Sequence, residues 1–171
     1  MSRHLRDFYP TPDSVIHAIL SNEQVMLLSI KDGVWEPCDG DSRITEALIA
    51  TAYDIYGLYS TDIALGQDFF DFKICLASTI ITNPPFKYIR QFIDHAFAIG
   101  VKQMVLVCPE RLWACKKGRK QFNRHRPSVW ANLDWREDYL GKGGAPDRAL
   151  AVAIWNKPHS RTCKFEVWSK P

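Results

Sequence analysis

No two of the five cysteines lie close together in the chain of 171 residues. They are Cys38, Cys75, Cys108, Cys115 and Cys163. Without a C-x-x-C pair, the sequence predicts neither a zinc site nor a disulfide framework, and we expect no metal. No apolar run is long enough to span a membrane, so we expect no membrane contact. Residues 1–6 lack the apolar region of a secretory signal, which favours a soluble, cytoplasmic protein.

Internal repeats, low-complexity tracts and shifts of composition are also absent, so we expect a single domain over residues 1–171. A hydrophobic content of 46% is enough for a packed core and is not that of a disordered chain. The net charge of +3 at pH 7 permits nucleic acid binding without indicating it.

Acidic residues are missing from one stretch, residues 111–126, which carries seven lysines and arginines. Such a run most often forms a solvated face or loop. Aromatic residues accompany it, namely Trp113, Phe122 and Trp130, and this combination is typical of a surface that binds phosphates and bases. The candidate nucleic-acid contacts are Lys116, Lys117, Arg119 and Lys120.

Apolar runs alternate with helical patterns along most of the chain. We expect strands at residues 34–36, 54–60, 78–82 and 104–108, and helices at 13–20, 23–30, 44–53 and 87–99. This alternation predicts an α/β protein with a mostly parallel sheet. Two last strands, at residues 149–156 and 162–168, have a short connector and predict an antiparallel hairpin at one sheet edge.

The tetrapeptide Asn83-Pro84-Pro85-Phe86 directly follows a buried strand. In an open α/β sheet, ligands bind at the carboxyl ends of the strands. The Asn83 side-chain oxygen and the Pro84 carbonyl can both accept hydrogen bonds from an NH2 group. Phe86 can stack on the ring that bears this group, and Pro85 stiffens the turn. An ordinary turn is the alternative, because Asn-Pro and Pro-Pro are common in turns.

A glycine loop, Glu36-Pro37-Cys38-Asp39-Gly40-Asp41-Ser42, follows an earlier strand and opens a helix. Gly40 allows a sharp turn and a close approach of the backbone to a ligand. Asp62 ends the next strand about twenty residues later. A glycine loop followed by a carboxylate at this spacing is the pattern of a nucleoside site, although Asp62 could instead cap a helix.

With these motifs, residues 9–168 resemble the amino-group methyltransferases that use S-adenosylmethionine, most closely the bacterial and phage DNA adenine-N6 type. The resemblance implies a Rossmann-like class I methyltransferase fold. It identifies the catalytic residues as Asn83, Pro84, Pro85 and Phe86. It identifies the cofactor-binding residues as Tyr9, Thr11, Pro12, Glu36, Cys38, Gly40, Asp62, Asp68, Phe69 and Asn83.

Within this family, the Tyr9-x-Thr11-Pro12 motif helps to hold the methionine part of the cofactor. Asp68 would accept from the amino group of the cofactor's adenine, and Phe69 would lie against its ring, although Asp68 could simply close a turn. The late strand at residues 151–155 resembles the one that helps to bracket the target base. Trp155 is therefore a candidate second wall for that base, with a core residue as the alternative.

The activity implied is methyl transfer from S-adenosylmethionine to adenine N6 in DNA. Similar tetrapeptides also serve cytosine N4, RNA bases and protein glutamine, and a silent methyltransferase fold acting as a binding subunit is a further alternative. Because the base must leave the duplex, flipping or a single-stranded substrate is required. Only a short insertion, around residues 113–146, is available for target recognition, so a protein partner or a second copy of the chain would supply the rest.

One residue departs from the family pattern, which has a second glycine where Ser42 stands. If φ is positive at this position, the serine costs about 1–2 kcal/mol. If φ is negative, its hydroxyl could cap the following helix. The first alternative predicts weakened cofactor binding.

Overall fold

The computed structural model describes residues 10–26, 28, 32–51, 55–136, 149–156 and 160–171. The strands are β1 (Val34–Glu36), β2 (Leu58–Ser60), β3 (Thr79–Thr82), β4 (Gln103–Pro109), β5 (Val129–Arg136), β6 (Ala149–Trp155) and β7 (Lys164–Trp168). The helices are α1 (Asp13–Leu20), α2 (Glu23–Met26), α3 (Arg43–Ala50), α4 (Ile89–Ala98) and α5 (Lys116–Arg124). Three short 3-10 helices are η3 (Ile63–Leu65), η4 (Phe69–Asp71) and η5 (Phe86–Tyr88).

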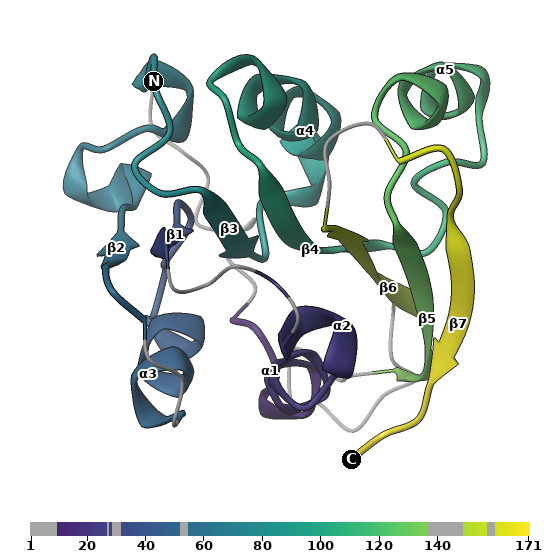
Figure 1. Cartoon of the computed structure of the whole chain (residues 1–171), viewed down its shortest axis with the longest axis horizontal. Coiled ribbons are helices and arrows are strands. Elements are labelled where there is room, and N and C mark those ends of the chain that lie inside the picture. The colour runs from purple at the N-terminus through teal and green to yellow at the C-terminus, as the bar shows by residue number, and fades with distance from the viewer. Residues whose placement is uncertain (1–9, 27, 29–31, 52–54, 137–148, 157–159) are drawn as a thin grey trace.

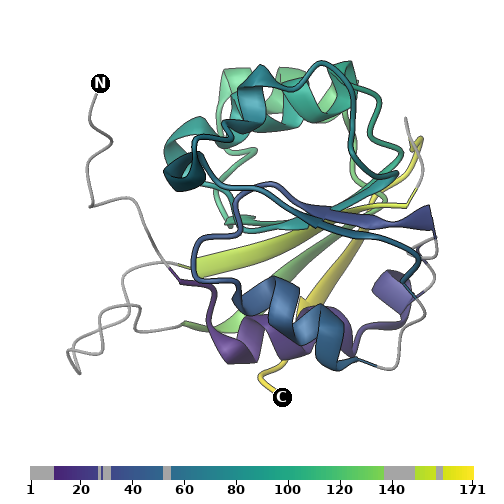
Figure 2. The same ribbon diagram turned by 90° about the vertical axis from the view of Figure 1, so that its left-hand side faces the viewer.

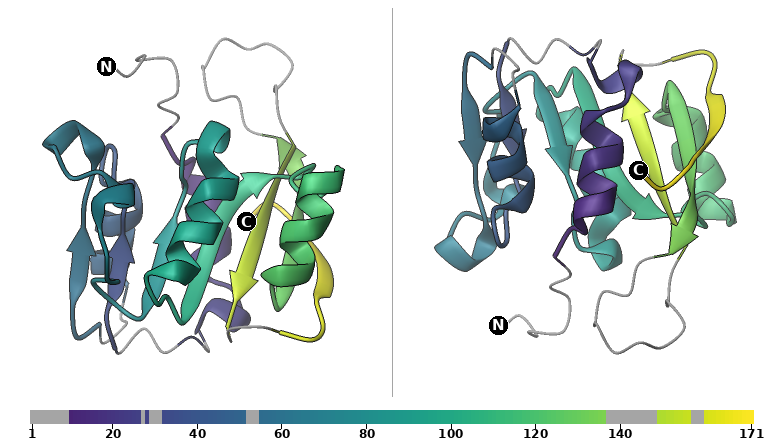
Figure 3. Two further views of the ribbon diagram at one scale, coloured as in Figure 1. Left: turned by 90° about the horizontal axis from the view of Figure 1, so that it is seen from above. Right: turned by 90° about the horizontal axis from the view of Figure 1, so that it is seen from below.

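The strands form one sheet in the middle of three layers (Figure 1). Seen along the sheet, α4 and α5 lie on one face and α1, α2 and α3 on the other (Figure 2). The views from above and below show the same separation of the helices (Figure 3). Within the described ranges, no helix has the length and apolar character needed to cross a membrane.

The sheet has the order β2-β1-β3-β4-β6-β5-β7. Strands β2, β1, β3 and β4 are parallel to their neighbours, and Thr82 of β3 lies opposite Leu106 of β4. Strand β6 is antiparallel to both β4 and β5, whereas β7 is parallel to β5. The expected fold class, α/β with a mostly parallel sheet and an antiparallel pair, is confirmed.

The strands of the antiparallel pair differ from the prediction. We expected β6 and β7 to form a hairpin, but β6 inserts between β4 and β5, where Ile154 lies opposite both Val105 and Val129. Strand β7 therefore lies outside β5, and the consecutive antiparallel strands are β5 and β6. Within the stretch around residues 113–146 that we considered for target recognition, α5 and β5 belong to the layers of the fold, and residues 137–146 lie outside the described residues.

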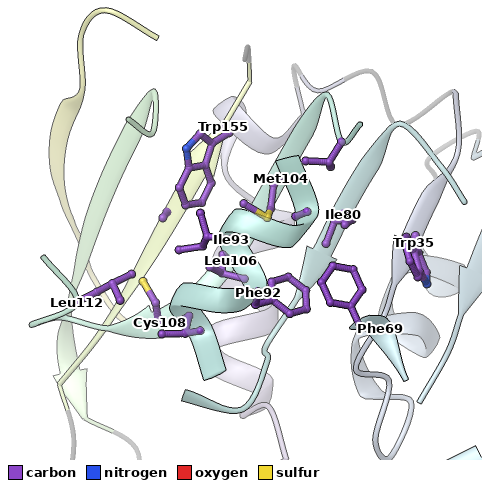
Figure 4. Packing of buried hydrophobic residues seen from close by; sticks show 14 of the residues in the cluster. Trp35, Phe69, Ile80, Phe92, Ile93, Met104, Leu106, Cys108, Leu112 and Trp155 are labelled. Carbon is purple, nitrogen blue, oxygen red and sulfur yellow. The ribbon is translucent and has the colours of Figure 1, made fainter. Parts of the chain in front are cut away.

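Each central strand contributes to two cores, because successive side chains point to opposite faces of a sheet. Val105 and Val107 of β4 pack in one core, with residues of α1, α2 and α3. Met104, Leu106 and Cys108 of the same strand pack in the other, with residues of α4. Figure 4 shows the second core. The continuous apolar sequence of β4 follows from this burial on both faces.

Gly118 allows α5 to pack closely on the turn after β4. A Cβ atom there would lie 2.6 Å from the carbonyl oxygen of Leu112 and 2.9 Å from the Cα atom of Trp113. Both are backbone atoms, so the helix or the turn would have to move. We therefore expect Gly118→Ala to lower the free energy of unfolding by about 1–3 kcal/mol, although alanine favours helices.

Urea unfolding would measure this loss, with Lys120→Ala as the control at an exposed position of the same helix. An unfolding midpoint for Gly118→Ala at or above that of the wild type would contradict the close packing.

Candidate functional site

The carboxyl ends of β2, β1, β3 and β4 meet at one edge of the sheet, since these strands are parallel neighbours. Strand β1 is followed in the chain by β2 on one side and flanked by β3 on the other, which makes the space between β1 and β3 a topological switch point. The loop at residues 37–42 leaves this edge from β1, and the Asn83–Phe86 tetrapeptide leaves it from β3. Two motifs far apart in the sequence are thus neighbours in the fold.

Glu36 links β1 to β3 from a buried position, with 1% of its surface exposed. Its Oε1 atom accepts hydrogen bonds from the Thr82 hydroxyl at 2.5 Å and the Cys38 backbone N–H at 2.8 Å. Its Oε2 atom is buried, and none of the described residues donates to it. Burial raises the pKa of Glu36 to about 8, against the lowering effect of Thr82 and Cys38. The carboxyl group therefore needs a proton or a cation at its second oxygen.

Asp62 closes the glycine loop. Its Oδ2 atom accepts from the backbone N–H of Gly40 at 3.1 Å, and its Oδ1 atom accepts from that of Ala64 at 2.7 Å. The residue is thus the cap of η3, as the alternative interpretation had it, and also a contact of the loop after β1. The structure brings Gly40 and Asp62 together, as a nucleoside site requires.

Ser42 has a positive φ of 64°, the less favourable of the two conformations considered from the sequence. Its hydroxyl donates to Asp39 Oδ2 at 2.8 Å, and Thr45 donates to the other oxygen of Asp39 at 2.5 Å. Ser42 is the N-cap residue of α3, but its hydroxyl makes no capping hydrogen bond to the helix. The left-handed backbone costs about 1–2 kcal/mol, and these two hydrogen bonds help to hold it.

Asn83 is held by the segment that precedes α1. Its Nδ2 atom donates to the Thr11 hydroxyl at 3.1 Å, and Thr11 is buried, with Pro12 half-buried after it. None of the described residues donates to the Asn83 Oδ1 atom. The amide is thus oriented with its oxygen available as an acceptor. Tyr9, the first residue of the predicted N-terminal motif, lies outside the described residues.

The rest of the tetrapeptide forms the turn that follows Asn83. Pro84 is buried and Pro85 half-buried, and both lack the N–H that a longer strand would need. Phe86 begins η5 and packs, partly exposed, against both cores. Its ring is therefore fixed by the fold while part of its surface stays accessible.

Comparison with known proteins rests on the fold, because no family model and no curated protein sequence matches the chain. A putative class I S-adenosylmethionine-dependent methyltransferase from Listeria monocytogenes superposes with a TM-score of 0.65 at 10% identity, over 99% of this chain and 68% of that one. The type I restriction-modification methyltransferase subunit from Streptococcus thermophilus gives a TM-score of 0.61 at 12% identity, over 94% of this chain and 47% of that one. The M protein of the type I restriction enzyme EcoKI gives a TM-score of 0.58 at 14% identity, over 97% of this chain and 49% of that one.

This is a class I methyltransferase fold. The chain spans about half the length of the two restriction-modification subunits. In this fold, the loop after β1 and the tetrapeptide after β3 lie at the same sheet edge.

Asp68 and Phe69 have different environments in this methyltransferase fold. Asp68 caps η4, where it accepts from the Phe70 N–H at 3.0 Å, and stays partly exposed. Phe69 is only 3% exposed, and its ring stacks on Phe92 with the centroids 4.0 Å apart (Figure 4). One face of the Phe69 ring is thus taken by the core, so the aromatic contact to a cofactor stays a prediction.

Trp155 is withdrawn as a second wall for the target base. The side chain has no exposed surface, and its indole N–H donates to the His125 carbonyl at 2.9 Å. Since β6 is a central strand, a residue on it is covered by helices, and the core interpretation is the one that the structure supports. The prediction rested on the resemblance of residues 151–155 to the strand that brackets the target base, and this resemblance does not determine how far the Trp155 side chain is exposed.

The four candidate phosphate contacts lie on α5 and are all exposed: Lys116, Lys117, Arg119 and Lys120. Only residues 110–115 separate the end of β4 from the start of α5, so this helix begins near the edge that carries the tetrapeptide. Among the described residues, none forms an ion pair with these four side chains. Arg124, by contrast, pairs with Asp94 at 2.6 Å. The described ranges contain no group of three or more residues arranged to hold a metal ion.

Proposed function

We propose that the chain transfers a methyl group from S-adenosylmethionine to the exocyclic N6 amino group of adenine in DNA. The observation that carries this proposal is the oriented amide of Asn83, beside the Pro84 carbonyl, at the switch point of a class I methyltransferase fold. Two acceptors next to each other are suited to an NH2 group and to no anionic or purely apolar ligand.

The acceptors act on the electron pair of the amine. An adenine amino nitrogen is a poor nucleophile because its lone pair is delocalised into the ring. When Asn83 Oδ1 and the Pro84 carbonyl accept its two N–H groups, they favour a pyramidal nitrogen with a localised lone pair. They also stabilise the positive charge that develops on this nitrogen during the reaction. Most of the remaining rate enhancement would come from holding the amine and the methyl donor in the geometry of the reaction.

The residues of the glycine loop fit the cofactor. The Oε2 atom of Glu36, to which none of the described residues donates, is a buried acceptor suited to the positively charged amino group of S-adenosylmethionine. Each oxygen of Asp62 accepts one backbone N–H, and a carboxylate has further lone pairs for the ribose hydroxyls. When bound, the cofactor supplies a methyl group on a positively charged sulfur, which is a strong electrophile.

Nucleic acid would approach along the edge between the tetrapeptide and α5. Phe86 would stack on the extruded base, which contributes about 1–3 kcal/mol. The basic residues of α5 would contact phosphates on the same strand. Since the chain spans about half of the restriction-modification subunits, we also propose that a protein partner or a second copy completes target recognition.

Mass spectrometry of nucleosides tests the proposal directly. DNA and RNA are incubated with the protein and S-adenosylmethionine, digested, and searched for methylated nucleosides. We expect N6-methyldeoxyadenosine from DNA. Methylated cytosine or guanosine would reassign the substrate, and the absence of any methylated nucleoside would reject nucleic acid as the substrate. Binding of the cofactor without any transfer would favour a silent subunit.

Asp62→Ala is expected to weaken cofactor binding by about 1.5–3 kcal/mol, because it removes a charge-assisted contact to the ribose. Isothermal titration calorimetry measures the change. Asp41→Ala is the matched control, since Asp41 lies in the glycine loop that Asp62 contacts but pairs with Arg43 at the surface. Equal affinities of the Asp62 variant and the wild type would assign the ribose contact to another residue.

Replacing Lys116, Lys117, Arg119 and Lys120 together with glutamine should weaken binding to unrelated sequences about equally. The slope of log affinity against log salt should flatten by about 0.7–0.9 for each phosphate that these side chains no longer neutralise. Fluorescence anisotropy on single- and double-stranded DNA measures both effects. Lys102→Gln, at the amino end of β4, is the control on the opposite sheet edge. An unchanged slope in the quadruple variant would mean that these side chains of α5 form a solvated face and do not contact phosphates.

A further inference from the structure

Glu110 is the first residue after β4 and lies at the same sheet edge as the tetrapeptide. Its backbone N–H donates to the Ala149 carbonyl at 3.1 Å, which fixes the main chain. Its Oε1 atom accepts from Asn132 Nδ2 at 3.0 Å, and Asn132 Oδ1 accepts from the indole N–H of Trp130 at 2.8 Å. Three side chains from two strands thus form one chain of hydrogen bonds.

The direction of these hydrogen bonds is determined by Trp130. An indole N–H only donates, so the oxygen of the Asn132 amide must face Trp130 and its NH2 group must face Glu110. Trp130 is 8% exposed and lies against Trp113, with their ring centroids 5.6 Å apart. The exposed carboxylate of Glu110 is therefore held by Asn132, which the buried Trp130 orients, and presents its second oxygen as an acceptor.

The position of Glu110 separates it from the target amine. Thr82 lies opposite Leu106, so Asn83 is one residue and Glu110 four residues beyond this pair. At about 3.3 Å per residue, Glu110 lies about 10 Å further along the edge than Asn83. Stacked bases of one strand are about 3.4 Å apart, so this distance corresponds to a few nucleotides. Glu110 is placed to meet a neighbour of the target base.

The charge of Glu110 selects what it can bind. Among the described residues it has no ion-pair partner, and the basic stretch at residues 111–126 follows it immediately. A carboxylate repels phosphates but accepts hydrogen bonds from amino groups, and Asp and Glu read the N4 amino group of cytosine in this way. Thymine offers no such amino group.

We propose that Glu110 is a specificity-determining residue, which accepts a hydrogen bond from the exocyclic amino group of a cytosine near the target base. Asn132 and Trp130 are its positioning residues. The inference rests on the proposed function, because it requires a nucleic acid substrate. It adds a preference for sequence context that neither the tetrapeptide nor α5 supplies.

The test compares methylation of oligonucleotides that carry cytosine or thymine at each of the three positions on either side of one adenine. The wild type should prefer cytosine at one position by about 5- to 30-fold in kcat/KM. Glu110→Gln keeps an acceptor for Asn132 but loses the charge, and should reduce this ratio at least several-fold. Asn132→Ala keeps the charge of Glu110 but removes the hydrogen bond that holds its carboxylate, and should reduce the ratio as well.

Glu46→Gln is the control, since it removes an exposed charge on α3 and should leave the ratio unchanged. Thermal melting of each variant identifies a loss of folding, which would lower rates on all oligonucleotides without changing the ratio. Methylation with no preference at any position, or a preference that survives in Glu110→Gln, overturns the inference and leaves the proposed function intact. No methylation of any oligonucleotide overturns both.

Discussion

Asn83→Ala is expected to lower the rate of methyl transfer by about 10²–10³, because the variant loses an acceptor aimed at the developing charge on the amine. Cofactor affinity should stay close to that of the wild type, since the Oδ1 atom is assigned to the substrate. Single-turnover kinetics and calorimetry measure the two effects separately. Near-normal turnover in this variant would reject the role of Asn83.

Thr11→Val provides a matched comparison for this prediction. It removes the hydroxyl that accepts from Asn83 Nδ2 but leaves the Asn83 side chain in place. The amide then loses its fixed orientation, so an intermediate loss of rate is expected. A Thr11 variant as slow as Asn83→Ala would mean that the hydrogen bond between the two side chains carries the whole effect.

Glu36→Gln is expected to make the protein more stable than the wild type at high pH. In the folded chain the pKa of Glu36 is about 8, above its ordinary value of 4.5, so the folded state holds a proton that the unfolded state releases. The resulting stability is fully present below pH 4.5 and is lost as the pH rises through 8. Each unit of pKa difference corresponds to about 1.4 kcal/mol, so the total loss is a few kcal/mol.

Glutamine is neutral throughout this range, so the difference in free energy of unfolding between the variant and the wild type should grow from pH 5 to pH 9. Urea unfolding at several pH values measures the difference, with Glu46→Gln as the exposed control. A difference that does not depend on pH would show that Glu36 titrates normally. The same variant should bind S-adenosylmethionine more weakly, because the amide cannot pair with a cation. Glu36 would then be a case in which a group needed for function lowers stability at high pH, where its buried carboxyl is charged.

Elements with a local signal could be predicted from the sequence. The apolar run at residues 104–108 and the strand before Asn83 were found because burial on both faces makes such strands continuously hydrophobic. Strand β5 was missed, because Asn132 and Asp134 interrupt its apolar residues and the basic run before it suggested a loop. The alternation of Val129, Ala131, Leu133 and Trp135 on one face was the available signal.

Strand pairing could not be predicted in the same way. The short connector between β6 and β7 favoured a hairpin, but the two edges of β6 are taken by β4 and β5. This choice depends on long-range packing and not on the local sequence. The same long-range packing determines the burial of Trp155, which lies on this central strand.

The chemistry of the site could be predicted where a single motif contains the residues, as in Asn83–Phe86. Contacts between residues of different motifs could not be predicted. The hydrogen bond from Asn83 to Thr11 joins residues 72 positions apart, and that from Thr82 to Glu36 joins residues 46 positions apart. The hydrogen bonds that link Trp130, Asn132 and Glu110 correspond to no sequence motif, because they depend on which strands become neighbours.

The central position of β6 determines when the sheet can form. Strand β4 pairs with β6, for example Val105 with Ile154, and so waits for a segment synthesised about fifty residues later. Until then, β4 has an unpaired edge and β5 has no partner strand, and such unpaired edges are where chains associate incorrectly. Non-local pairing of this kind also slows folding. A chain shortened before residue 149 would therefore be expected to aggregate, although it would retain both the glycine loop and the tetrapeptide.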